Sequence, residues 1–114
     1  MAERRMFSKH ITESDEFLNM TKNAQCLYYH LCMYADDDGF INNVKSVIRM
    51  VGSSAEYLKE LKRNNYVHEF DSGIILIMHW KIHNYIQKDR YRPSTHTKEK
   101  NQVELVYNST YVLK

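Results

Sequence analysis

Apolar positions in the first third of the chain recur with the period of an α-helix. Residues 11–20 predict a short helix in which Thr12 and Asp15 stand at the spacing of a capping box. Residues 21–35 predict a longer helix with Thr21 as its N-cap. The side chains expected to be buried on these helices are Phe17, Leu18, Met20, Ala24, Leu27, Tyr28, Leu31, Cys32 and Tyr34.

Three consecutive aspartates interrupt the helical pattern in the sequence ADDDGF at residues 35–40. Aspartate and glycine favour turns, and Phe40 and Ile41 suit a short strand. Calcium-binding loops place their carboxylates at alternate positions before the glycine, whereas these carboxylates are contiguous. A turn is therefore the better interpretation, and no metal site is predicted.

Two further helices and a hairpin complete the regular pattern. Residues 42–52 predict a helix with Gly52 at its C-terminal cap, and residues 53–67 predict a second helix in which Ser53 and Glu56 form a capping box. Residues 66–80 predict a β-hairpin whose second strand is apolar on both faces. Helix, strand, helix-turn-helix and hairpin predict an α+β fold, a winged helix with a short three-stranded sheet.

The chain divides by this pattern into a winged-helix domain at 1–80 and a C-terminal extension at 81–114. The extension is rich in basic and aromatic residues, and its apolar side chains are expected to pack on the domain while its cations point outward. Residues 109–114, STYVLK, predict a strand. The expected short helix lies within 98–105.

Charge is distributed unevenly along the chain. Residues 1–42 carry four Lys and Arg against seven Asp and Glu, residues 43–80 carry five against four, and residues 81–114 carry seven against three. The net values are therefore −3, +1 and +4, which sum to the +2 of the whole chain. A basic segment on a near-neutral domain indicates a polyanionic partner, most often nucleic acid.

Several function classes find no support in the sequence. No apolar run is long enough to span a membrane, and the N-terminal residues lack the apolar core of a signal peptide, so a cytoplasmic location in a bacterial host is expected. Cys26 and Cys32 lie on different faces of one helix and are expected to stay reduced. Catalytic motifs, phosphate-binding glycine loops and recurring metal-ligand spacings are lacking, so neither an enzyme nor a cofactor is predicted.

Two sets of cations are the candidate DNA contacts. Lys59, Lys62 and Arg63 lie on the second helix of the helix-turn-helix, which enters the major groove in many proteins. In the extension, the candidates for phosphate contacts are Lys81, Lys88, Arg90 and Arg92. The first surface is mixed in sign, because Glu56 shares it and the hairpin tip is acidic. A protein-interaction module that forms dimers or higher oligomers, or a small transcriptional regulator, therefore stays open as an alternative.

The segments AQCLYYHLCMYADDDGFINN (24–43) and HWKIHNYIQKDRYRP (79–93) resemble the N-terminal domain of phage replisome organisers from Gram-positive hosts. These proteins are related to the DnaD-like primosome proteins. The resemblance implies a winged-helix domain of a protein that binds the double-stranded phage origin and helps recruit a helicase loader and helicase. It also implies self-association through the same domain. It carries over no functional-residue motif.

Overall fold

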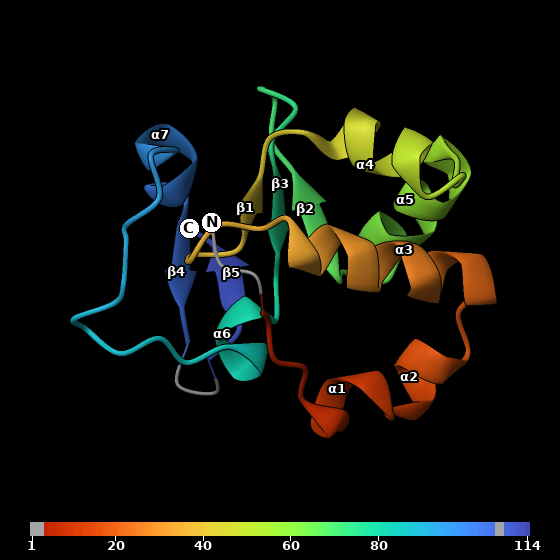
Figure 1. The fold of residues 1–114 in the computed structure, drawn as a ribbon, viewed down its shortest axis with the longest axis horizontal. Coiled ribbons are helices and arrows are strands. Elements are labelled where there is room, and N and C mark those ends of the chain that lie inside the picture. The colour runs from red at the N-terminus through yellow and green to blue at the C-terminus, as the bar shows by residue number, and fades with distance from the viewer. Residues whose placement is uncertain (1–3, 107–108) are drawn as a thin grey trace.

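The computed structural model describes residues 4–106 and 109–114 (Figure 1). These residues form a compact α+β fold with seven helices and five short strands. The helices are α1 (Lys9–Thr12), α2 (Asp15–Leu18), α3 (Lys22–Met33), α4 (Val44–Met50), α5 (Ala55–Arg63), α6 (Trp80–His83) and α7 (Thr97–Lys100). The strands are β1 (Phe40–Ile41), β2 (Val67–Glu69), β3 (Ile75–Ile77), β4 (Val103–Leu105) and β5 (Tyr111–Leu113).

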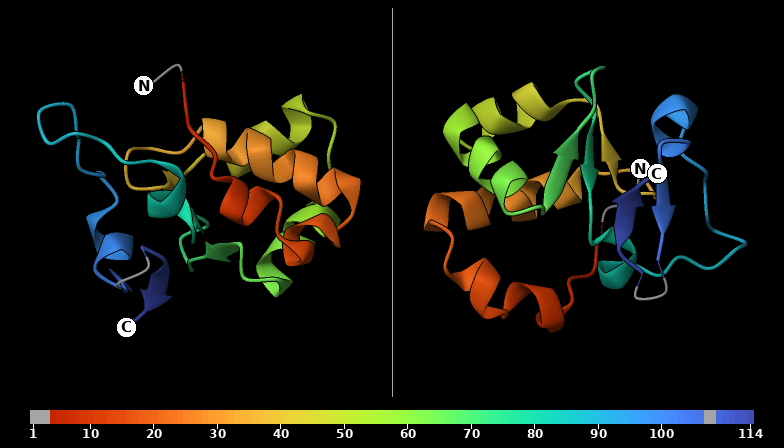
Figure 2. Two further views of the ribbon diagram at one scale, coloured as in Figure 1. Left: turned by 90° about the horizontal axis from the view of Figure 1, so that it is seen from below. Right: turned by 180° about the vertical axis from the view of Figure 1, so that it is seen from behind.

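A three-stranded antiparallel sheet of order β1-β3-β2 stands at the centre of the molecule. Its middle strand, β3, is buried at every position, as the apolar sequence predicts. Helices α1 to α5 lie on one side of the sheet, and α6, α7 and the β4-β5 pair lie on the other side (Figures 1 and 2). The core nevertheless is continuous, because Val103 and Tyr111 join the same apolar cluster as α3 and β3.

Local signals in the sequence place the start of α3 and the end of α4 correctly, whereas the Thr12–Asp15 capping box does not form. The Thr21 side chain accepts a hydrogen bond from the Ala24 amide and caps α3, as predicted. The helix predicted over 11–20 is instead two single turns, because α1 ends at Thr12 and Ser14 caps α2 by accepting from the Phe17 amide. Leu18 consequently faces solvent and is half exposed.

The connection between α4 and α5 differs from the predicted capping box. Gly52, with φ +68°, donates to the Arg49 carbonyl, and the Ser53 amide donates to the Ile48 carbonyl. This pair of bonds is a Schellman motif that ends α4. Since Ser53 belongs to that motif, α5 begins one residue later with Ser54 at its N-cap position.

The extension follows the predicted order with different boundaries. Residues 80–83 form the single turn α6, residues 84–96 run without regular structure, and α7 is followed by the β4-β5 pair. The strand expected at 109–114 is β5. The helix expected within 98–105 is only partly present, because α7 ends at Lys100 and residues 103–105 form strand β4. In the described part of the chain, no helix has both the length and the apolar character to cross a membrane. Cys26 and Cys32 are both free thiols.

Candidate nucleic-acid interface

The three aspartates form a polar junction that holds the extension against the rest of the molecule. Asp36 Oδ1 accepts from the amides of Asp38 and Phe40, which closes the turn, and its Oδ2 accepts from Ser94 Oγ at 2.6 Å. Asp37 binds Arg5 at 3.2 Å and accepts from the Arg92 amide. The carboxylates are therefore fully engaged by protein donors.

Asp38 is the centre of this junction and is only 2% exposed. Its carboxylate accepts hydrogen bonds from the Tyr91 hydroxyl at 2.7 and 2.8 Å and from the Ser94 amide at 2.8 Å. The ammonium groups of Lys81 and Lys100 lie 3.0 and 3.1 Å from its two oxygens. Burial alone raises the pKa of Asp38, but these bonds outweigh burial and hold the pKa below its ordinary value.

Lys81 therefore serves the fold. Its ammonium group contacts the Asp38 carboxylate and the Asp37 carbonyl, and it lies 5.1 Å from the centre of the Tyr91 ring. If Lys81 moved to a phosphate, the buried Asp38 carboxylate would lose one of its two ammonium partners and keep only Lys100. We do not retain it among the proposed DNA contacts.

The N-terminal segment is fixed to the beginning of the extension. His83 Nδ1 accepts from the Ser8 amide at 2.8 Å, so the neutral ring carries its proton on Nε2 and donates to the Tyr28 oxygen at 2.7 Å. Burial lowers the pKa of His83 to about 4, with His79 adding to the effect. The Met6 amide also donates to Asn84 Oδ1. Residues 4–8 are thus held beside residues 83–84.

A groove of about 770 Å³ lies between α4, α5 and the β2-β3 hairpin, and we call it the lysine groove. Lys45, Lys59 and Lys62 line it, together with the single acidic residue Glu69. Lys62 pairs with Glu69 at 2.6 Å, and both side chains are more than a third exposed. Such a pair is weak in water. Within the described residues, the charged ends of Lys45 and Lys59 have no ion-pair partner.

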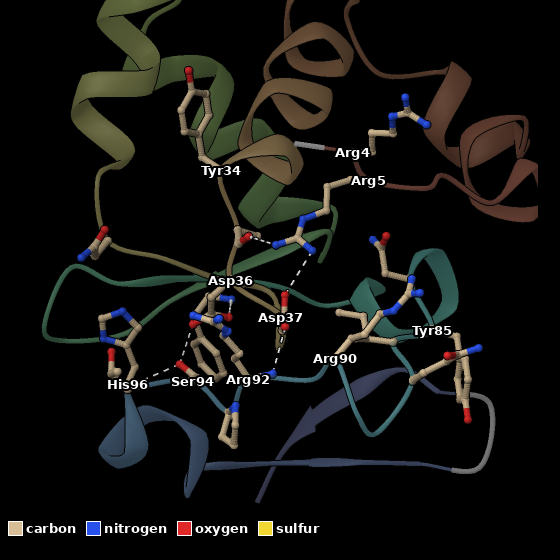
Figure 3. A pocket seen from close by; sticks show the side chains of 18 residues that line it. Arg4, Arg5, Tyr34, Asp36, Asp37, Tyr85, Arg90, Arg92, Ser94 and His96 are labelled. Carbon is tan, nitrogen blue, oxygen red and sulfur yellow. Dashed lines mark hydrogen bonds and ion pairs between the residues drawn. The ribbon is translucent and has the colours of Figure 1, made fainter. Parts of the chain in front are cut away.

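A second hollow, of about 810 Å³, lies between the N-terminal segment, residues 34–37 and residues 84–96. We call it the arginine cleft. Arg5 reaches into it from one wall, while Tyr85, Arg90 and Arg92 come from the opposite wall (Figure 3). Four arginines and two aspartates line the cleft, which gives its lining a formal charge of +2.

The structure separates the two sets of predicted contacts. Lys59, Lys62 and Arg63 belong to α5, at one end of the long axis, and the 84–96 segment with Arg90 and Arg92 forms the other end (Figure 1). Lys88 is exposed in the same segment but lines neither hollow. The seven residues therefore do not form one patch, and their contact with DNA stays a prediction.

Sequence reasoning missed Lys45 and Arg4. Lys45 lies in the first turn of α4, where only its exposed position beside an apolar stripe signals a surface role. Arg4 lies 86 positions before Arg90, and only the fold brings both to one cleft. Comparisons of the chain with protein-family models, curated proteins and solved structures found no match.

Proposed function

We propose that the chain is a non-enzymatic DNA-binding domain of a phage replication initiation protein, a replisome organiser acting in the cytoplasm of its bacterial host. The order α3, β1, α4, α5, β2, β3 is that of a winged helix, with α5 as recognition helix and the β2-β3 hairpin as wing. The resemblance of residues 24–43 and 79–93 to replisome organisers supports the role in replication. In that role the domain binds double-stranded origin DNA and helps assemble the replisome, with a helicase loader as a further partner.

The lysine groove is the observation that carries the DNA-binding proposal. It lies where the recognition helix and wing of a winged helix meet duplex DNA, and it has three lysines against one glutamate. Phosphate contacts from lysine supply affinity without reading sequence. Lys62 is available to phosphate despite its bond to Glu69, because an exposed ion pair costs little to exchange.

A protein-interaction role is the second candidate. Three apolar side chains of the β4-β5 region are exposed, namely Leu105, Val106 and Leu113. The tip of the β2-β3 hairpin is acidic, with Glu69 and Asp71, and suits phosphate poorly. Self-association or docking of a helicase loader through these surfaces is compatible with DNA binding in the lysine groove.

Fluorescence anisotropy with a duplex that contains the phage origin, and with a scrambled duplex, tests the DNA proposal. The double variant Lys45→Ala, Lys59→Ala should weaken binding at least tenfold, and each lost phosphate contact should reduce the salt slope by about 0.9. The matched control Lys9→Ala, Lys22→Ala removes the same charge from exposed residues outside the groove and should bind nearly as the wild type. Equal losses of affinity in both variants would mean that the protein binds DNA through its overall charge and not through the groove. Full affinity in the Lys45→Ala, Lys59→Ala variant would refute the proposal.

A further inference from the structure

The arginine cleft is not explained by binding of a duplex in the lysine groove. The two hollows share only Asn42 in their linings, and α5 and the 84–96 segment lie at opposite ends of the molecule (Figures 1 and 2). A single ligand in the lysine groove therefore does not contact the arginines of the cleft, and a separate ligand has to be considered for them.

The positive charge of the cleft is available to a ligand. Both aspartates of its lining already accept protein hydrogen bonds, and Arg5 is committed to Asp37 and to the Ala35 carbonyl. By contrast, the guanidinium groups of Arg4, Arg90 and Arg92 are exposed and have no ion-pair partner in residues 4–106 and 109–114. A guanidinium group binds phosphate oxygens in bidentate geometry.

Two buried donors beneath the cleft lack an acceptor. Arg5 Nε and Asn84 Nδ2 have no hydrogen-bond partner within the described residues, and both residues line the cleft. The Arg5 side chain is 4% exposed and Asn84 is 5% exposed. Unpaired buried N–H groups are costly, and both of these require an oxygen acceptor. Neighbouring atoms cover them, so an acceptor reaches them only when the side chains of the cleft shift.

An aromatic ring stands free at the edge of the cleft. Tyr85 is 81% exposed although its neighbours His83 and Asn84 are buried. The ring lies on the same wall as Arg90 and Arg92 (Figure 3). Exposed aromatic rings beside cations are typical of surfaces that stack unpaired bases and hold the backbone between them.

We propose that the arginine cleft binds an unpaired nucleic-acid strand, with Arg4, Arg90 and Arg92 on the phosphates and Tyr85 stacked on a base. The volume of about 810 Å³ lies in the range of small-ligand pockets, so the cleft can take a short stretch of unpaired strand but cannot enclose a duplex. An acidic peptide would satisfy the arginines but would leave the Tyr85 ring without a flat partner. The site takes its ligand independently of the lysine groove.

Anisotropy with labelled oligothymidylate and oligouridylate of about 20 nucleotides, longer than typical sites of about 4–16, tests this inference. The double variant Arg90→Ala, Arg92→Ala should lose at least tenfold in affinity for the preferred strand. Tyr85→Ala should lose about 5- to 150-fold in affinity, the range for a base stacked on an aromatic ring, whereas Tyr85→Phe should bind as the wild type. These side chains are exposed, so the variants should fold, which circular dichroism verifies.

The lysine groove variant Lys45→Ala, Lys59→Ala provides the control. It should keep its affinity for the single strand while losing affinity for the duplex, so failure of one proposal is distinguished from failure of the other. Tighter binding of oligothymidylate would identify the ligand as single-stranded DNA, and tighter binding of oligouridylate would identify it as RNA. Either result supports the inference. Unchanged affinity in Tyr85→Ala, displacement of the strand by polyglutamate as effectively as by unlabelled strand, or no binding by the wild type would overturn it.

Discussion

Replacing Asp38 with asparagine tests whether the polar junction depends on a buried negative charge. The change preserves the size of the side chain and one acceptor oxygen. It removes the charge that faces the ammonium groups of Lys81 and Lys100 at 3.0 and 3.1 Å. It also turns an acceptor into an amide donor that points at another donor, so at least one of the bonds to this side chain is lost.

The expected loss of stability follows from the burial of each partner. Breaking one side of a buried ion pair costs about 3–5 kcal/mol. The Lys81 and Lys100 side chains are 24% and 38% exposed, so water compensates part of that cost. We therefore expect the free energy of unfolding to fall by about 3 kcal/mol, at the lower end of that range. At an m-value of about 1.5 kcal/mol per molar urea, the midpoint should fall by about 2 M.

Urea unfolding followed by the fluorescence of Trp80, which is fully buried and is the only tryptophan, measures this change. Asp71→Asn is the matched control, because Asp71 lies exposed in the hairpin turn and should change stability by less than about 0.5 kcal/mol. A second variant, Tyr91→Phe, should show an interaction energy of at least about 1 kcal/mol with Asp38→Asn in a double-mutant cycle. A loss under about 1 kcal/mol for Asp38→Asn, or strict additivity of the two changes, would refute the reasoning.

Two further predictions concern the packing around Trp80 and His83. Because the pKa of His83 is lowered from 6.5 to about 4, the unfolded chain binds a proton in this window that the folded chain does not. The contribution of this residue to the free energy of unfolding is therefore complete above about pH 6.5 and falls by about 3 kcal/mol as the pH decreases to about 4. His83→Gln should flatten the dependence of the free energy of unfolding on pH between these values. An unchanged dependence would contradict the lowered pKa of His83. Gly39→Ala should cost about 2–5 kcal/mol, because a Cβ there would lie 2.7 Å from Trp80 and φ is +96°. Gly73→Ala, with φ +88° and no neighbour within 4 Å, should cost only about 1–2 kcal/mol, and equal thermal unfolding midpoints for the two variants would count against the steric explanation.

The elements that the sequence predicts correctly are those fixed by neighbouring residues. The Thr21 cap, the Gly52 terminus and the turn at the three aspartates each depend on contacts within about five positions. The capping box predicted at Ser53 does not form, and the cause is also local: the Ser53 amide bonds to the Ile48 carbonyl at the end of α4. Two local signals compete there, and the pattern alone does not show which one prevails.

The candidate site depends instead on distant contacts. The sequence marks the 79–93 segment as basic and aromatic, but it does not reveal that Lys81 turns inward to Asp38 while Tyr85 turns outward. The orientation of Lys81 follows from a partner 43 positions away in the sequence. The two hollows also require residues from separate parts of the chain, such as Arg4 with Arg90, so no single stretch predicts either one.

The junction at Asp38 also has a consequence for the order in which the chain folds during synthesis. The residues that donate hydrogen bonds to Asp38 follow it by 43 to 73 positions, the last being Tyr111, whose hydroxyl donates to the Asp38 carbonyl. Closing such long loops costs entropy that only the completed contacts repay, whereas α3 and the β2-β3 hairpin close short loops. Until Lys81 and the residues after it have been made, the Asp38 carboxylate lacks the donors that bind it in the folded protein. The Asp38 carboxylate acquires its partners only after residues 81–100 have been made, so these residues have to dock onto a turn formed in the first third of the sequence.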